Sequence, residues 1–151
     1  MKRKRHDALI PLSHHHHHAL VEAVKLKRAG TAKSKFTPEE IVQSLQAFWY
    51  PGGNKHFREE EEILLPAFAR FQSVDRPEII ENLLEHVQIR SLVQQVIHVK
   101  DDPVPLMHKL GDMLDSHIRK EERIIFPMIE DALPEEVLAE IKPDLHGNHK
   151  D

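Results

Sequence analysis

Four stretches of the chain repeat apolar residues at the 3.6-residue period of an α-helix, and this pattern limits the possible folds more than any other feature. The stretches cover residues 8–29, 37–71, 75–99 and 105–133. Gly30 is a helix-ending residue after the first, and Thr37 with Glu40 forms a capping box that begins the second. Long amphipathic helices joined by short connections predict an all-α fold, an antiparallel up-down-up-down four-helix bundle.

The length of 151 residues suits a single domain with its own core. We expect one domain over residues 1–151, with the bundle core at about 6–133 and a short fifth helix and a tail at 134–151. The sequence "YPGGN" in the second stretch predicts a kink or a short break there.

Composition excludes several classes of function. The formal net charge of −4 argues against a nucleic-acid partner. The absence of cysteine excludes disulfides, thiolate zinc sites and cysteine nucleophiles. No segment approaches the ~18 consecutive apolar residues of a membrane helix, so we expect no membrane partner and a cytoplasmic location. The basic start "MKRKR" is expected to be a frayed end.

Histidine is unusually frequent, with 13 residues in the chain. Each of the four apolar stripes carries one histidine on its inward face, and two stripes carry a glutamate one turn later. These residues are His16, His56, Glu60, His86, His117 and Glu121. A buried carboxylate costs several kcal/mol unless it is paired or binds a metal. Apart from Arg90, the sequence contains no obvious cationic side chain to pair with these two carboxylates, so we predict that metal ions supply the positive charge.

Both His–Glu pairs belong to an internal repeat. The segments "HFREEEEILLP" (56–66) and "HIRKEERIIFP" (117–127) agree at 6 of 11 positions. The repeat places the same pair of side chains on two helices, where they can face each other. Apart from Glu60, the "REEEE" run is expected to form a solvated face, whereas Ile124 and Ile125 continue the inward stripe.

The run of five histidines, His14 to His18, looks like a purification tag but lies within a continuous amphipathic pattern. His16 falls in the middle of the apolar stripe and is the predicted ligand. His17, at the edge of the stripe, is the second choice. His14, His15 and His18 are expected to point to solvent.

Imidazole and carboxylate ligands without sulfur suit iron, manganese or zinc. A single zinc ion takes about four ligands. Four imidazoles and two carboxylates spread over four helices suit two metal ions bridged by the carboxylates, which is the arrangement of di-iron carboxylate bundles.

The segments "LSHHHHHAL", "HFREEEEILLP", "EHVQIRSL" and "HIRKEERIIFP", in this order, resemble the hemerythrin-like or HHE cation-binding domain, from about His6 to Pro127. The resemblance implies an antiparallel four-helix bundle with two non-heme iron ions. It implies that His16 and His56 bind one iron and that His86 and His117 bind the other. Glu60 and Glu121 would then bridge the two irons.

The chain departs from the oxygen carriers of that family at two positions. Arg90 stands where the carriers have a further histidine, so a water, Glu61 or Tyr50 could complete the site, or Arg90 could neutralise a bridging glutamate. The carriers place the second bridging carboxylate five residues after its histidine, which makes Glu122 an alternative to Glu121.

The resemblance implies a di-iron protein that binds or senses dioxygen, another small diatomic molecule, a peroxide, or iron itself. Two alternatives stay open. One is a di-iron peroxidase or oxidase, and the other is a regulatory or interaction module stabilised by its metal. The sequence predicts no oligomeric state.

Overall fold

The computed structural model describes residues 4–145, and within this range the chain is helical and contains no strand. The all-α prediction is therefore confirmed. The α-helices are α1 (Ile10–Arg28), α2 (Pro38–Phe48), α3 (Asn54–Glu59), α4 (Leu65–Ala69), α5 (Pro77–His98), α6 (Val104–Lys120), α7 (Phe126–Ala132) and α8 (Glu135–Ile141). Three π-helical turns are η1 (Trp49–Gly53), η2 (Glu60–Leu64) and η3 (Glu121–Ile125), and η4 (Lys142–Asp144) is a 3-10 turn.

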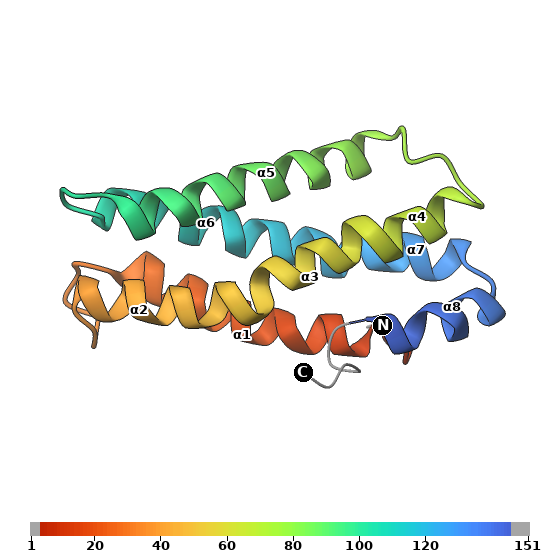
Figure 1. Cartoon of the computed structure of the whole chain (residues 1–151), viewed down its shortest axis with the longest axis horizontal. Helices are drawn as coiled ribbons and strands as arrows, with labels where there is room; N and C mark the ends of the chain where they lie inside the picture. Colours follow the sequence, from red (N-terminus) through yellow and green to blue (C-terminus); the bar gives the residue numbers. More distant parts are fainter. Residues whose placement is uncertain (1–3, 146–151) are drawn as a thin grey trace.

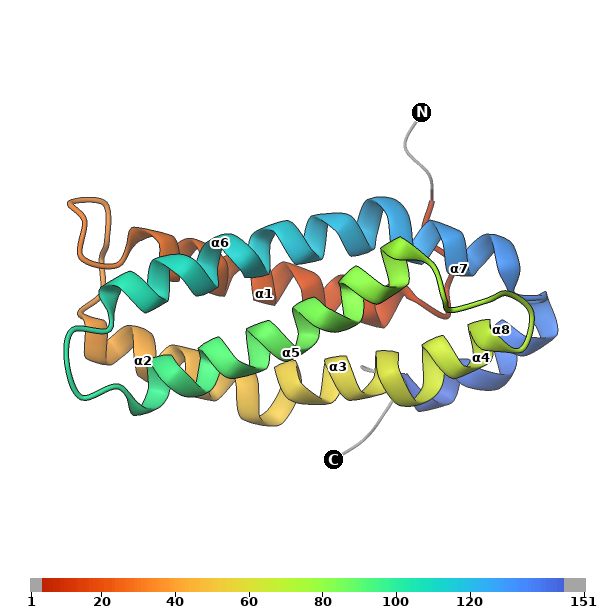
Figure 2. The ribbon, with the colours of Figure 1, turned by 90° about the horizontal axis from the view of Figure 1, so that it is seen from above.

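The long helical runs lie side by side. Figures 1 and 2 show α1, the run α2–α4, α5 and the run α6–α7 next to one another, with the chain reversing direction from each to the next. The short helix α8 follows α7 and lies at the end of the molecule where α4 ends. No helix in residues 4–145 combines the length and the apolar character needed to cross a membrane.

The helix boundaries follow local sequence signals. The Thr37 side chain accepts a hydrogen bond from the Glu40 backbone N–H at 3.1 Å, and the Glu40 carboxylate accepts one from the Thr37 N–H at 2.8 Å. This reciprocal pair is the predicted capping box. Gly30, with φ of 72°, ends α1 in the left-handed region that glycine adopts without strain.

At "YPGGN", where a kink or a short break is predicted, the structure has the π-turn η1, and the helical run continues through it without a break. A Cβ at Gly53 would lie 2.7 Å from Trp49 Cε3 and 3.0 Å from Phe48 Cε2. Only glycine therefore fits between these two rings without a shift of the aromatic side chains.

The internal repeat is also a structural repeat. Glu60 and Glu121 begin the π-turns η2 and η3, and Pro66 and Pro127 follow those turns in the first turn of α4 and of α7. Proline has no N–H to donate to the carbonyl four residues earlier, which favours a locally widened turn. Single π-turns of this kind are frequent at functional sites.

Two separate apolar clusters fill the interior. One contains Leu9, Leu12, Leu64, Phe68, Phe126 and Ile129, and is closed by residues of α8. The other contains Leu26, Leu45, Trp49, Leu92 and Leu110. A polar layer that belongs to neither cluster is formed by four buried histidines and two buried glutamates, His16, His56, Glu60, His86, His117 and Glu121.

Candidate metal centre

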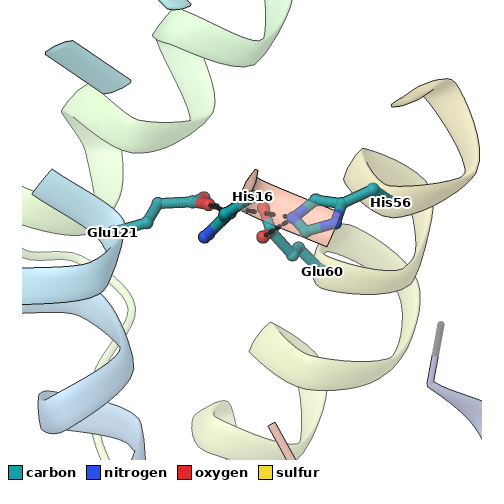
Figure 3. A group of neighbouring side chains, drawn as sticks. All are labelled: His16, His56, Glu60 and Glu121. Carbon is teal, nitrogen blue, oxygen red and sulfur yellow. Dashed lines mark hydrogen bonds and ion pairs between the residues drawn. The ribbon is translucent and has the colours of Figure 1, made fainter. Parts of the chain in front are cut away.

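The six side chains predicted from the sequence come together in the polar layer. All are buried, with exposed fractions from 0% for His86 and Glu121 to 4% for His16. They form two overlapping groups, in each of which the nitrogen and oxygen ligand atoms lie within 4.8 Å of one another. The groups are His16, His56, Glu60 and Glu121 (Figure 3), and Glu60, His86, His117 and Glu121. The two glutamates are common to both.

The Glu121 carboxylate divides its oxygens between the two groups. Oε1 lies 3.0 Å from His16 Nε2 and 4.0 Å from His56 Nε2. Oε2 lies 3.4 Å from His86 Nε2 and 3.2 Å from His117 Nε2. A carboxylate oriented in this way can place one oxygen on each of two metal ions.

Glu60 is arranged in the same way. Its Oε2 lies 2.7 Å from His56 Nε2, and its Oε1 lies 3.0 Å from His86 Nε2. Neither oxygen accepts a hydrogen bond of normal geometry, although both are buried. Neighbouring ligands of an octahedral ion at ~2.1 Å lie about 3.0 Å apart, so these separations suit atoms that share a metal. The residues therefore fit a pair of metal ions.

The outer nitrogens of three histidines meet carboxylates that lie around the centre. His16 Nδ1 lies 2.6 Å from Glu122, His86 Nδ1 lies 2.6 Å from Glu61, and His117 Nδ1 lies 2.7 Å from Glu85. Each contact fixes one proton on Nδ1, so that loss of the second proton would leave the Nε2 lone pair directed at the centre. This is the protonation state that a metal-binding histidine requires.

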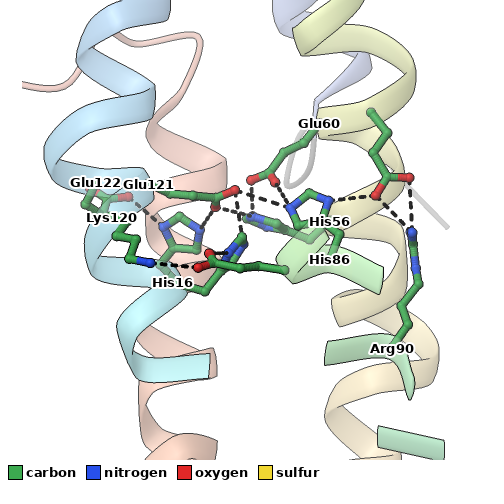
Figure 4. A network of polar contacts seen from close by, with 11 residues as sticks. His16, His56, Glu60, His86, Arg90, Lys120, Glu121 and Glu122 are labelled. Atoms are coloured by element: carbon green, nitrogen blue, oxygen red, sulfur yellow. Dashed lines mark hydrogen bonds and ion pairs between the residues drawn. The ribbon is translucent and has the colours of Figure 1, made fainter. Parts of the chain in front are cut away.

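A cation supports each of these outer carboxylates, and Figure 4 shows two of these cations, Arg90 and Lys120. Arg5 lies 3.1 Å from Glu122, Arg90 lies 2.9 Å from Glu61, and Lys120 lies 2.7 Å from Glu85. We call the three sets Arg5–Glu122–His16, Arg90–Glu61–His86 and Lys120–Glu85–His117 the cation–carboxylate–histidine chains. Each outer negative charge is balanced locally, so these carboxylates orient the imidazoles without adding net charge to the centre.

The pKa values of the two shared glutamates are shifted in opposite directions in the metal-free centre. Burial, with the nearby charge of Glu121, raises the pKa of Glu60 to about 8. Although burial opposes it, the charge and hydrogen bonds of His117 and the other imidazoles hold the pKa of Glu121 well below its usual range.

The imidazole pKa values shift upward. Burial lowers the pKa of a histidine, but here the carboxylates outweigh it and raise the pKa of His16 and of His117 to about 9 and that of His86 to about 11. Protons therefore supply the positive charge in the metal-free centre, and a metal ion must displace them.

One of the predicted solvent-exposed histidines is buried. His15 is 8% exposed, and its ring stacks on Phe48 at 5.3 Å and on His56 at 4.9 Å between centroids. His14 and His18 are exposed as expected. His17, the second choice as a ligand, is also exposed and belongs to neither group. The helical wheel missed His15 because the aromatic rings of the α2–η1 segment cover that side of α1.

The residues expected to stand in for the histidine that Arg90 replaces do not belong to either group of converging ligand atoms. Arg90 binds Glu61 rather than a shared glutamate, and Glu61 contacts the outer nitrogen of His86. Tyr50 is 55% exposed. Glu122 contacts the outer nitrogen of His16, so Glu121 rather than Glu122 lies between the two groups.

Two smaller expectations were wrong. In the "REEEE" run Glu59 is buried and Glu61 binds His86 and Arg90, so the run is not a solvated face throughout. At the basic start, Arg5 is not frayed: it donates hydrogen bonds to Glu122 and Glu130.

A small cavity adjoins the centre on the side of His16, His56 and His117. Its volume is about 20 Å³. The other residues around it include His15, Phe48, Trp49, Phe57, Leu114 and Ile118. Phe57 also stacks on His86, with 3.9 Å between the ring centroids. An apolar wall of this kind keeps water away from the centre.

A family model described as the hemerythrin HHE cation-binding domain matches residues 8–129. The match covers most of the chain, and the protein belongs to this family. The search among curated proteins found no match. The search among solved structures also found none.

Proposed function

We propose that the protein is a non-heme di-iron protein, built as an antiparallel four-helix bundle, that binds or senses dioxygen or a related small molecule. The observation that carries the proposal is the sharing of Glu60 and Glu121 between two groups of buried imidazoles. One ion would be held by His16 and His56 and the other by His86 and His117. Both glutamates would bridge the ions.

The donor set supports iron. It combines imidazole nitrogens with carboxylate oxygens and contains no sulfur, because the chain has no cysteine. Each ion would receive two imidazole nitrogens and two carboxylate oxygens. Iron commonly takes more ligands than these four, which leaves coordination positions for an external molecule. Iron pairs supply electrons for binding or reducing dioxygen and peroxides.

The surroundings support a small ligand. The apolar cavity of about 20 Å³ beside His56 has room for one or two non-hydrogen atoms, since a water needs roughly 10–15 Å³. A ligand of that size, bound with one atom at an open coordination position, would be shielded from bulk water.

Metal analysis after anaerobic reconstitution tests the proposal. We expect about two iron ions per chain, and a near-ultraviolet absorption from a bridged ferric pair after exposure to air. Glu121→Ala removes the carboxylate that contacts all four imidazole groups and should abolish binding of the pair.

Glu62→Ala is the matched control, because Glu62 is exposed and its carboxylate pairs with Arg58 on the same helical run. It should load iron as the unaltered protein does. A stoichiometry near zero in the unaltered chain, or equal loading of both variants, would contradict the proposal.

A further inference from the structure

His15 lies next to the proposed centre although it belongs to neither group of converging ligand atoms. It is 8% exposed and lines the cavity together with His16, His56 and His117. Among the described residues that line the cavity, these four histidines and Trp49, through its indole N–H, carry polar side-chain atoms. The remaining wall is aromatic and aliphatic.

The other three histidines are committed to the centre. Their Nε2 atoms lie 2.7 to 3.2 Å from the nearest oxygen of Glu60 or Glu121. His15 precedes His16 on α1 and is therefore turned by about 100° from it around the helix axis. This turn takes its ring away from Glu121 and onto the cavity wall, beside Phe48.

The position of the His15 ring is fixed by its neighbours. It stacks on Phe48 with an interplanar angle of 13° and on His56 with an angle of 28°. Stacking covers the faces of a ring and leaves its nitrogens at the edge. Phe48 is in turn held against Gly53 in the π-turn η1, where a Cβ would approach its ring to 3.0 Å. A ring held in this way can present an N–H in a constant direction.

We propose that His15 determines which ligand the cavity accepts, by donating a hydrogen bond to a small anionic ligand of two or three atoms that is bound to the metal. This inference rests on the proposed di-iron centre. A hydrogen bond to an ionised acceptor is stronger than one to a neutral acceptor, and more so in an apolar cavity. An N–H donor fixed on a wall that is mostly aromatic and aliphatic therefore favours azide-like or peroxide-like anions over neutral diatomic molecules.

Azide is a suitable probe, because one of its atoms would bind the metal and about 20 Å³ of cavity remains for the others. The experiment measures azide affinity and the azide infrared stretching frequency in iron-loaded, oxidised protein. For His15→Leu, which removes the donor and fills similar space, we expect at least about ten-fold weaker azide binding and a shifted frequency. For His15→Gln, which restores an N–H donor, we expect partial recovery of both.

His17→Leu is the matched control, because His17 is an exposed neighbour on the same helix. It should leave affinity and frequency unchanged. Iron content separates this inference from the proposed function: failure of the unaltered chain to load iron defeats both. Normal iron loading with equal azide binding in His15→Leu, or no azide binding at all, overturns the role of His15 alone. Loss of iron in His15→Leu also overturns it, since His15 would then act as a ligand.

Discussion

Removal of the Glu61 carboxylate should weaken metal binding without touching any of the six converging residues. Glu61 accepts the His86 Nδ1 proton at 2.6 Å and pairs with Arg90 at 2.9 Å. The His86 side chain is 1% exposed, so in Glu61→Ala a buried N–H loses its acceptor. Such a loss costs roughly 1–3 kcal/mol.

The exposure of Glu61 narrows this range. Its side chain is 25% exposed, so water can partly replace the lost oxygen, and the lower part of the range, about 1–2 kcal/mol, applies. This corresponds to roughly 5- to 30-fold weaker iron binding. Glu61→Gln keeps an acceptor but removes its charge. Because charged hydrogen bonds are about twice as strong as neutral ones, we expect iron binding by this variant to be roughly 2- to 5-fold weaker than by the unaltered protein.

The assay is anaerobic competition for ferrous iron between the protein and a chelator of known affinity, at neutral pH. Glu62→Gln serves as the control, because the Glu62 side chain is 59% exposed and pairs with Arg58 at 3.3 Å on the same helical run. The expected order of affinity is unaltered protein and Glu62→Gln, then Glu61→Gln, then Glu61→Ala. Equal affinity of Glu61→Ala and the unaltered protein would refute the role assigned to the outer carboxylate.

Three further results are expected. The pKa of His86 is raised to about 11 and that of His16 to about 9, so their stabilisation of the metal-free fold is complete below pH 6.5 and falls as pH rises, being lost through about pH 9 for His16 and about pH 11 for His86; thermal unfolding of the metal-free protein should show this fall, and iron should remove it. Gly53→Ala should lower the free energy of unfolding by roughly 1–3 kcal/mol, because its Cβ would meet Trp49 at 2.7 Å, and an unchanged denaturation midpoint would contradict this. Thr37→Ala should cost about 1 kcal/mol through loss of the capping box, measured by urea unfolding, with iron content unchanged.

The helical period was enough to find the residues that converge. His16, His56, His86 and His117 interrupt apolar stripes at positions that a helical wheel places inward, and all four are buried. Each of these residues lies in a regular α-helical segment, where the 3.6-residue period of the wheel applies locally.

The wheel failed within the π-turn η3, because a π-turn adds a residue to a helical turn and so shifts the direction of the side chains by up to about 100°. Ile124, expected inward, is 46% exposed, while Ile125 and Phe126 are buried. Helical periodicity did not predict η2 or η3. The proline that ends both copies of the repeat was the available sign, because it removes a backbone hydrogen bond and so favours a widened turn.

The outer carboxylates were missed for a different reason. Glu85 and Glu122 lie beside the apolar stripes of their helices, at positions where the pattern of a single helix predicts exposure to solvent. Their contacts with His117 and His16 come from neighbouring helices, so they depend on how the helices pack. A pattern within one segment contains no information about such pairs.

The separation of the two apolar clusters has a consequence for unfolding. In the metal-free protein the layer between them is polar and holds protonated acids and imidazoles, so we expect each apolar half to open partly independently of the other. Metal ions bound to all the long helical runs would tie the halves into one cooperative unit. Amide hydrogen exchange should then report two levels of protection in the metal-free protein and a single, higher level when iron is bound.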